Sequence, residues 1–199
     1  SNAELRAPHP LRVADARSGS QDCGPIICGY APRRRNQAEY SMTPALNKAL
    51  PEFEALATSG VKITPETFHR QAVVLYFYPK DNTPGCTTEA MQFRDRHKDF
   101  VKAGALVLGV SRDNMASHEK FKSNLELPFE LIADTEEKLC HMFGVVKNKI
   151  MYGKKVKGIE RSTFLIGADG VLKQEWRGLK VPGHVEEVLK AVKALKKAA

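Results

Sequence analysis

Residues 73–78 read VVLYFY and are followed by Pro79. Every side chain in this run is β-branched, aliphatic or aromatic, which is typical of a strand buried on both faces of a sheet. Residues 88–103 then repeat apolar side chains at helical spacing, and residues 105–110 read ALVLGV, a second apolar run. A strand, a helix and a strand in this order predict a βαβ unit with two parallel strands.

The rest of the chain adds further elements of both kinds. We expect a helix over 115–123, a strand over 129–132, a short helix over 136–143 and an amphipathic helix over 185–195. Residues 161–166 and 171–176 flank Gly-Ala-Asp-Gly, which predicts an antiparallel hairpin. The sequence therefore predicts an α/β fold of three layers, a central mixed β-sheet flanked by helices.

A length of 199 residues favours one folded domain. Residues 1–3 resemble the remnant of an expression tag and are left out of the fold prediction. Residues 4–41 contain four prolines and the run Arg33-Arg34-Arg35 without sustained periodicity, so we expect a poorly packed N-terminal extension. The folded domain is expected over residues 42–199.

The composition excludes several classes of protein. With 42% hydrophobic residues the chain can bury a core, which excludes a disordered or fibrous chain. The longest apolar run, 72–78, is far shorter than the roughly 20 residues of a membrane-spanning helix, so we expect no membrane association. The four cysteines are too few and too unevenly spaced for a secreted disulfide scaffold, and they form no Cys-x-x-Cys pair, which argues against a zinc ribbon or a thioredoxin-type dithiol. A reducing, cytoplasmic compartment is therefore expected.

Residues 76–89 (YFYPKDNTPGCTTE), which include the end of the first strand and the loop after it, carry a candidate nucleophile. Thr83 is a natural helix N-cap and Pro84 suits the first helical position, which places Cys86 in the first turn. Free backbone N–H groups and the helix dipole favour a thiolate there. A lone cysteine is more often a small buried hydrophobe, but Cys86 follows the carboxyl end of a buried strand, where open α/β sheets place their sites.

The spacing Pro79-x-x-x-Thr83-x-x-Cys86 resembles the active-site motif of the peroxiredoxins. Its flanks, Tyr-Phe-Tyr-Pro before and Pro-Gly-Cys-Thr after, are similar to the bacterioferritin-comigratory-protein branch, also called the Q-type peroxiredoxins. The resemblance runs from about residue 45 to the C-terminal helix. It implies a thioredoxin-like fold and the thiol-dependent reduction of hydrogen peroxide and organic hydroperoxides through a sulfenic acid at Cys86.

The same resemblance implies a role for each motif residue. Residues 158–164 (GIERSTF) match the family segment that carries an arginine, here Arg161. By resemblance, Pro79 shields the pocket and the Thr83 hydroxyl binds a peroxide oxygen. Backbone N–H groups near Gly85 and Cys86 hold the peroxide, and Arg161 stabilises both the thiolate and the transition state.

One common form of the family carries a second, resolving cysteine five residues after the first. That position is Met91 here. Five residues span about 7.5 Å along a helix, beyond the roughly 7 Å between Cα atoms that an unstrained disulfide allows, so such a pair needs the helix to unwind. The helix over 115–123, where related enzymes place another resolving cysteine, contains none either.

Three other thiols remain as resolving candidates. Cys140 lies beside Leu139 in an apolar helix, which favours a buried structural cysteine over a resolving one. Cys23 and Cys28 lie in the extension, where a cysteine is more often incidental. We therefore expect a one-cysteine cycle in which an external thiol, such as thioredoxin, glutaredoxin or glutathione, attacks the sulfenate.

Two further features leave alternatives open. Glu89 lies one helical turn after Cys86, where it either pairs with Arg161 or is an ordinary exposed helix carboxylate. Five lysines at 147, 149, 154, 155 and 157 precede Arg161. They favour a solvated loop, with an electropositive rim that attracts anionic thiols as the alternative.

Two other functions remain as alternatives. A thiol–disulfide reductase of the same fold needs a neighbouring dithiol, which the absence of Cys-x-x-Cys argues against. The net charge of +8 suggests a nucleic-acid-binding or holdase protein, but no aromatic residues interleave the lysines and no reader motif is visible. Because the six histidines show no ligand spacing, we expect no metal and no cofactor. The expected partners are a small peroxide and the external thiol, for a chain that is a monomer or weak dimer.

Overall fold

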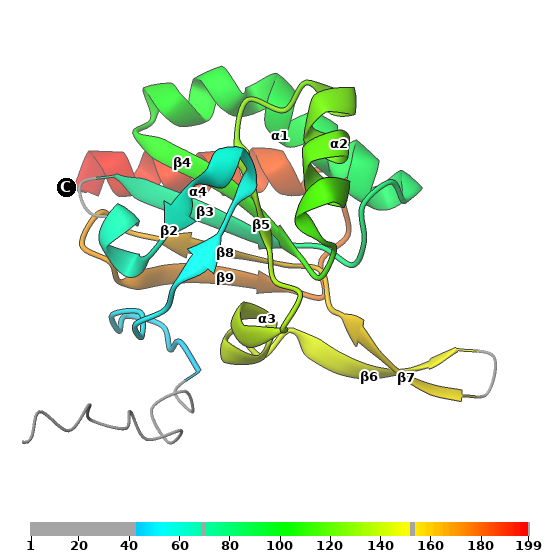
Figure 1. The fold of residues 1–199 in the computed structure, drawn as a ribbon. Helices are drawn as coiled ribbons and strands as arrows, with labels where there is room; N and C mark the ends of the chain where they lie inside the picture. Colours follow the sequence, from blue (N-terminus) through cyan, green and yellow to red (C-terminus); the bar gives the residue numbers. More distant parts are fainter. Residues whose placement is uncertain (1–42, 69–70, 152–153, 199) are drawn as a thin grey trace, which may run out of the picture. The chain divides into compact units, whose positions relative to one another are not determined.

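The computed structural model describes residues 43–68, 71–151 and 154–198 (Figure 1). Within the second and third of these ranges, only the backbone is described for residues 149–156 and for residue 198. The extension expected over residues 1–41 lies outside the described residues, and Cys23 and Cys28 lie there with it.

A five-stranded sheet forms the centre of the domain, in the order β5-β4-β3-β8-β9. Its strands are β3 (Ala72–Phe77), β4 (Ala105–Ser111), β5 (Glu130–Ala133), β8 (Ser162–Ile166) and β9 (Leu172–Arg177). β3 pairs in parallel with β4, and β4 with β5, whereas β8 is antiparallel to both β3 and β9. The predicted βαβ unit, the C-terminal hairpin and the mixed sheet are therefore confirmed.

The described residues also form four α-helices: α1 (Pro84–Lys102), α2 (Met115–Leu125), α3 (Lys138–Met142) and, after the last strand, α4 (His184–Ala198). α1 begins at Pro84, as the capping pattern predicts, four residues before the apolar periodicity of residues 88–103 sets in. α2 runs two residues further than expected and ends where Glu126 adopts a left-handed φ of 52°. No helix among the described residues is long and apolar enough to cross a membrane.

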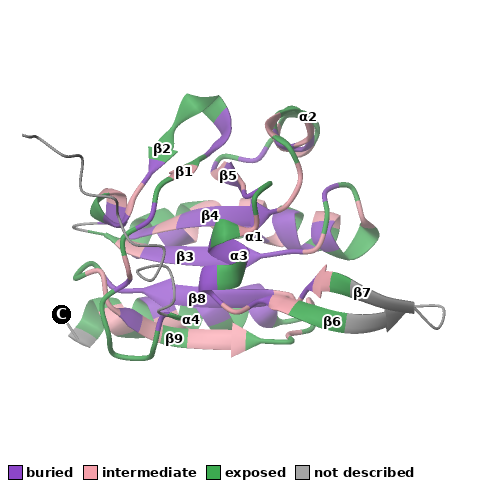
Figure 2. Ribbon diagram, turned by 60° about the horizontal axis from the view of Figure 1, so that its bottom comes forward, coloured by how far each residue is buried: buried purple, intermediate pink, exposed green. Residues whose placement is uncertain are grey.

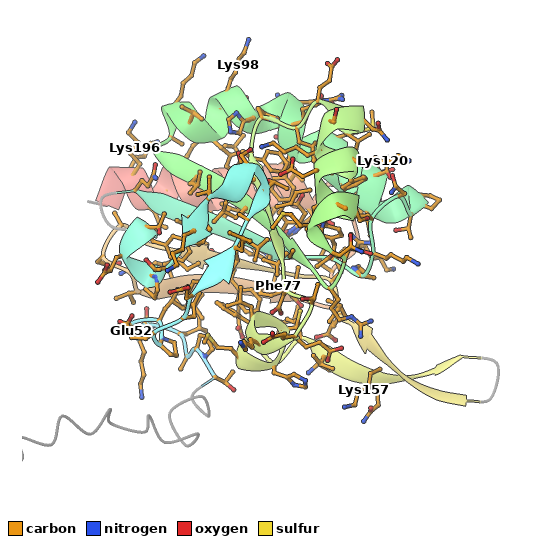
Figure 3. All side chains as sticks on the ribbon, viewed as in Figure 1. Glu52, Phe77, Lys98, Lys120, Lys157 and Lys196 are labelled. Carbon is orange, nitrogen blue, oxygen red and sulfur yellow. The ribbon has the colours of Figure 1, made fainter. Side chains whose placement is uncertain are left out.

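Both faces of the sheet are covered, which explains why residues 73–78 are apolar throughout. Alternate residues of this run belong to two separate core clusters: Val73, Leu75 and Phe77 to one, Val74, Tyr76 and Tyr78 to the other. The first cluster includes residues of α3 and of the N-terminal segment 50–68, and the second includes residues of α1, α2 and α4. Figure 2 shows the buried strands between these layers. In Figure 3, Phe77 lies inside the domain, whereas Lys98, Lys120 and Lys196 extend from the outer sides of α1, α2 and α4.

Two smaller sheets complete the domain. β1 (Ala55–Leu56) and β2 (Lys62–Ile63) pair antiparallel, with short 3-10 turns at Thr58–Gly60 and Pro65–Phe68. β6 (Val146–Met151) and β7 (Lys154–Ile159) form a hairpin that extends from the sheet (Figure 1). The favoured expectation of a solvated loop here was wrong. The segment contains β-branched residues, which favour strands, within and on either side of the lysine run, at 146, 150, 156 and 159. The high charge obscured this strand preference.

Candidate active site

Cys86 is the third residue of α1 and lies in its first turn, as the capping pattern predicts. β3 ends at Phe77, a short loop carries the chain to Thr83, and Pro84 begins the helix. Only 2% of Cys86 is exposed. The thiol is therefore next to the backbone N–H groups of the first turn, which have no acceptor within the helix.

Thr83 takes the N-cap position, but its side chain makes no capping hydrogen bond. Its hydroxyl instead donates to the carbonyl oxygen of Lys80, 3.0 Å away. The N–H groups of Gly85 and Cys86 are therefore not occupied by the Thr83 side chain. These N–H groups point out of the N-terminal end of α1, where a small anionic or polar ligand can accept hydrogen bonds from them.

Arg161 approaches the Cys86 thiol from the start of β8, the strand that pairs with β3. It comes directly before β8, and Phe77 at the end of β3 pairs with Ser162 at the start of β8. Antiparallel pairing thus brings Arg161 to the carboxyl end of β3, although 75 residues separate it from Cys86. Its Nη2 donates to Cys86 Sγ at 3.2 Å.

Glu89 completes this group from the next turn of α1. Its side chain is fully buried, and its Oε2 accepts a hydrogen bond from Arg161 Nη1 in an ion pair, so the pairing alternative holds. Oε1 has no hydrogen-bond partner among the residues that the structure describes. Burial raises the pKa of Glu89 to about 7, although the charge of Arg161 and the hydrogen bond from it act to lower that pKa. A single guanidinium therefore serves both a thiol and a buried carboxyl group.

Pro79 and Gly85 border the same site. Pro79 is half-buried at the end of β3, and Gly85 is exposed. A Cβ atom added at Gly85 would lie 3.4 Å from Arg161 Nη2. A side chain at Gly85 would therefore contact the guanidinium.

Cys140 lies in a different layer of the fold from Cys86. It belongs to the core cluster that includes α3 and Phe77, whereas Cys86 belongs to the cluster on the other face of the sheet. Burial raises the pKa of the Cys140 thiol far above its ordinary value, and Asp134 raises it further. Both described cysteines are free. A disulfide between them would require the sheet or α1 to come apart.

Met91 gives no substitute for a resolving thiol. It lies on α1 with 37% of its surface exposed. Its side chain is therefore on the solvent side of the helix, while Cys86 faces the core. Among the residues that the structure describes, no three His, Cys, Asp or Glu side chains are grouped so that they could hold a metal ion.

A buried polar cluster beside the loop was missed by the sequence analysis. Asp81 Oδ2 lies 2.9 Å from His118 Nδ1 on α2, and both side chains are buried. Tyr78 Oη donates to Asp81 Oδ1 at 2.8 Å, and Ser117 Oγ donates to Oδ2 at 2.7 Å. Burial alone would raise the pKa of Asp81, but the hydrogen bonds from His118, Ser117 and Tyr78 lower it below its ordinary value. Asp81 is therefore an ionised group that ties α2 to the active-site loop.

The sequence contains a weak signal for this cluster. His118 lies three residues before Phe121 on α2, so both side chains occupy the buried face of the helix. A histidine on an apolar helix face needs partners for both ring nitrogens. Ile132 supplies the second, because its carbonyl oxygen lies 3.1 Å from Nε2. Nothing in the sequence identifies Asp81 as the first partner.

The fold and the site together define an α/β protein of thioredoxin-like architecture with a buried thiol beside an arginine at the start of a helix. Comparison with known families agrees, because residues 46–175 match the AhpC/TSA family. The chain belongs to this family of peroxiredoxins and is a thiol-dependent peroxidase, which acts on a peroxide with a thiol as reductant.

Curated relatives and solved structures support this membership along most of the described chain. Peroxiredoxin Bcp of Bacillus subtilis is 46% identical over 152 residues, which cover 76% of this chain and 97% of the relative. Peroxiredoxin Bcp of Xanthomonas campestris is 49% identical over 137 residues, or 69% of this chain and 86% of the relative. A crystal structure of Xanthomonas campestris peroxiredoxin Q superposes with a TM-score of 0.70 at 46% identity, covering 72% of this chain and 91% of that one. The predicted thioredoxin-like fold and the peroxiredoxin resemblance are therefore confirmed.

Proposed function

We propose that Cys86 is the peroxidatic nucleophile and that Thr83, Arg161 and the N–H groups of Gly85 and Cys86 bind the peroxide. The contact of 3.2 Å between Arg161 Nη2 and Cys86 Sγ is the observation that carries this proposal. The guanidinium N–H that donates to sulfur fixes the position of the thiol beside a permanent cation. Pro79 shields the loop side of the pocket, in keeping with its half-buried position.

The first step is a two-electron transfer from sulfur to oxygen. The Cys86 thiolate attacks the nearer peroxide oxygen, an S–O bond forms and the O–O bond breaks. The leaving alkoxide or hydroxide takes up a proton and departs as an alcohol or water. Cys86 becomes a sulfenic acid, and the peroxide is reduced.

The rate of this step cannot come from ionisation alone. A free thiol with a pKa of about 8.5 is already a few per cent thiolate at pH 7, so complete ionisation gains only about 30-fold. The rest must come from donors that bind the breaking O–O bond more tightly than they bind the intact peroxide. Arg161 and the first-turn N–H groups are placed to supply these donors.

We further propose a one-cysteine cycle completed by an external thiol. Thioredoxin, glutaredoxin or glutathione attacks the sulfenic sulfur, water leaves, and a second thiol releases Cys86 from the mixed disulfide. Two observations support this: Cys140 lies across the sheet, and Met91 occupies the position of the common resolving cysteine. Because Cys86 is 2% exposed, a bulky thiol requires the first turn of α1 to open locally.

The free thiols also favour a reducing, cytoplasmic setting, and we propose a monomer or weak dimer as the active form. These proposals rest on cysteine usage and on the Q-type resemblance.

Intact-mass measurement of the oxidised protein tests the cycle. The protein is treated with one equivalent of hydrogen peroxide, with and without glutathione, and digested to locate the modified cysteine. We expect a sulfenic acid at Cys86 that converts to a mixed disulfide with glutathione. An intramolecular Cys86–Cys140 or Cys86–Cys23 disulfide in good yield would overturn the one-cysteine cycle while leaving the peroxidase assignment intact.

A turnover assay tests the reaction itself. Peroxide consumption with dithiothreitol should vanish in Cys86→Ser and persist in Cys140→Ala. Consumption that survives Cys86→Ser would contradict the assignment of the nucleophile. Disulfide reduction without peroxide consumption would indicate the reductase alternative instead.

A further inference from the structure

One peptide group in the active-site loop, the peptide between Lys80 and Asp81, is held at both of its polar ends. Its carbonyl oxygen accepts from the Thr83 hydroxyl at 3.0 Å. Its N–H group donates to Asp113 Oδ2 at 2.8 Å. Because a trans peptide is planar, its N–H and C=O bonds point in opposite directions, so fixing the N–H also fixes where the carbonyl points.

The direction of this carbonyl decides what Thr83 offers to a ligand. A threonine hydroxyl has one hydrogen to donate and two lone pairs that accept. With the hydrogen given to Lys80, the lone pairs alone remain for a molecule in the pocket. A neutral peroxide carries the complementary O–H, so it binds with that O–H directed at Thr83.

Asp113 is itself held in place by the strand that precedes it. It follows β4, which is parallel to β3, and parallel pairing brings the carboxyl ends of these strands to the same edge of the sheet. Ser111 Oγ donates to Asp113 Oδ2 at 2.7 Å, and the Asp113 N–H donates back to Ser111 Oγ at 3.1 Å. The hydrogen-bond partners of Asp113 are thus Ser111 and the Asp81 N–H, and it has no hydrogen bond to the thiol or to Arg161.

We propose that Asp113 is a positioning residue for the peroxidase reaction. Its carboxylate holds the Lys80–Asp81 peptide so that Thr83 donates to Lys80 and presents its lone pairs to the O–H of the peroxide. Without Asp113, the peptide is free to rotate and the Thr83 hydroxyl loses its fixed acceptor. This inference rests on the proposed peroxide-binding role of Thr83.

The test is a double-mutant cycle between Asp113→Ala and Thr83→Val. The main readout is the second-order rate constant for oxidation of Cys86 by hydrogen peroxide, measured by rapid quench and mass spectrometry. The second readout is the rate of Cys86 alkylation by iodoacetamide, which needs the thiolate but not Thr83. Each single variant should slow oxidation at least tenfold and change alkylation less than twofold. In the Thr83→Val background, Asp113→Ala should cause less than a threefold further loss.

Two further variants separate positioning from a general loss of structure. Asp113→Asn keeps an oxygen that accepts from the Asp81 N–H, so it should restore oxidation to within threefold of wild type. Asp169→Ala is the matched control, because Asp169 Oδ1 also accepts a backbone N–H, that of Val171, in a distant hairpin turn. It should change neither rate.

Several outcomes would overturn the inference. These are multiplicative losses in the double variant, equal losses in Asp113→Ala and Asp113→Asn, or parallel falls in oxidation and alkylation. A normal oxidation rate in Thr83→Val would also overturn it, but it would assign the failure to the proposed role of Thr83. An oxidation loss confined to Thr83→Val would leave that role standing and remove Asp113 from it.

Discussion

At the scale of single residues, the Cys86 site depends on how one guanidinium is shared. Arg161 uses Nη2 for the thiol and Nη1 for the buried Glu89, a planar geometry that an ammonium group cannot reproduce. Ionised Glu89 offsets part of the charge that would otherwise act on the thiolate. The two neighbours of Cys86 therefore have opposite electrostatic effects on it.

Substitution of Arg161 by lysine should show that oxidation of Cys86 needs the planar guanidinium with its two donating nitrogens. We expect Arg161→Lys to lower the second-order rate constant for Cys86 oxidation by about 10²-fold, the usual effect of removing one preorganised donor. Stopped-flow or rapid-quench measurement with hydrogen peroxide checks this. Arg177→Lys is the matched control, because Arg177 also bonds through two nitrogens, to Phe143 and Glu175, away from the thiol. A rate within threefold of wild type in Arg161→Lys would contradict the prediction.

Glu89 should make the stability of the protein depend on pH. Its pKa in the folded state is about 7, raised by burial from 4.5, so the folded protein binds a proton that the unfolded chain releases. This contribution to stability is fully present below pH 4.5 and is lost as the pH rises through 7. Relative to Glu89→Gln, the wild type should lose about 3 kcal/mol of unfolding free energy over this range.

Urea unfolding at pH 5, 6, 7 and 8 measures this difference. Glu66→Gln, a substitution at an exposed glutamate, is the control, and its difference from wild type should stay constant. A constant difference for Glu89→Gln as well would show that Glu89 is not held neutral by burial.

At the scale of elements, α2 and the loop after β3 act as one unit. Asn114 caps α2 by accepting from the Ser117 N–H at 2.9 Å. The following turn supplies Ser117 and His118 to the carboxylate of Asp81. The loop that leads to Thr83 is thereby anchored to α2.

Breaking the buried Asp81–His118 pair should cost much more than removing the exposed cap. We expect His118→Ala to lower the free energy of unfolding by about 3 kcal/mol, because it leaves a buried carboxylate without one of its hydrogen-bond partners. Asn114→Ala should lower it by about 1 kcal/mol. Urea denaturation of both variants at pH 7 checks the order, and equal losses would contradict it.

At the scale of the whole domain, the sheet separates the two described thiols into different environments. Cys86 lies in the core cluster that includes α1, next to a cation, and Cys140 lies in the cluster that includes α3, next to Asp134. A carboxylate and burial keep the Cys140 thiol protonated. The same residue type therefore lies beside a guanidinium on one face and beside a carboxyl group on the other.

Substitutions of the two cysteines test this separation, because one should affect stability and the other should affect activity. Cys140→Ala should lower the free energy of unfolding by about 1–2 kcal/mol through the lost buried sulfur, while peroxide turnover stays within twofold of wild type. Cys86→Ser should abolish turnover and change stability by less than 1 kcal/mol. Turnover with dithiothreitol and urea unfolding measure both. A large loss of turnover in Cys140→Ala would give Cys140 a part in the cycle.

Local patterns determined much of this protein. The apolar run 73–78, the helix start at Thr83 and Pro84, and the order of strands and helices predicted the mixed sheet and the place of Cys86, because each depends on neighbours along the chain. The hairpin of β6 and β7 was missed, because its lysines obscured β-branched residues that pair across a turn.

The family resemblance named Arg161 and left the pairing of Glu89 open, and tertiary structure decided how these groups meet the thiol. Strand pairing over 75 residues brings Arg161 to Cys86, the buried face of α1 turns Glu89 into a partner rather than a solvated carboxylate, and the parallel ends of β3 and β4 bring Asp113 to the Lys80–Asp81 peptide. Burial and hydrogen bonding depend on atoms distant in sequence, and no local pattern encodes them. The sequence by itself thus placed Cys86 in the first turn of a helix, and the fold decided which groups lie around it.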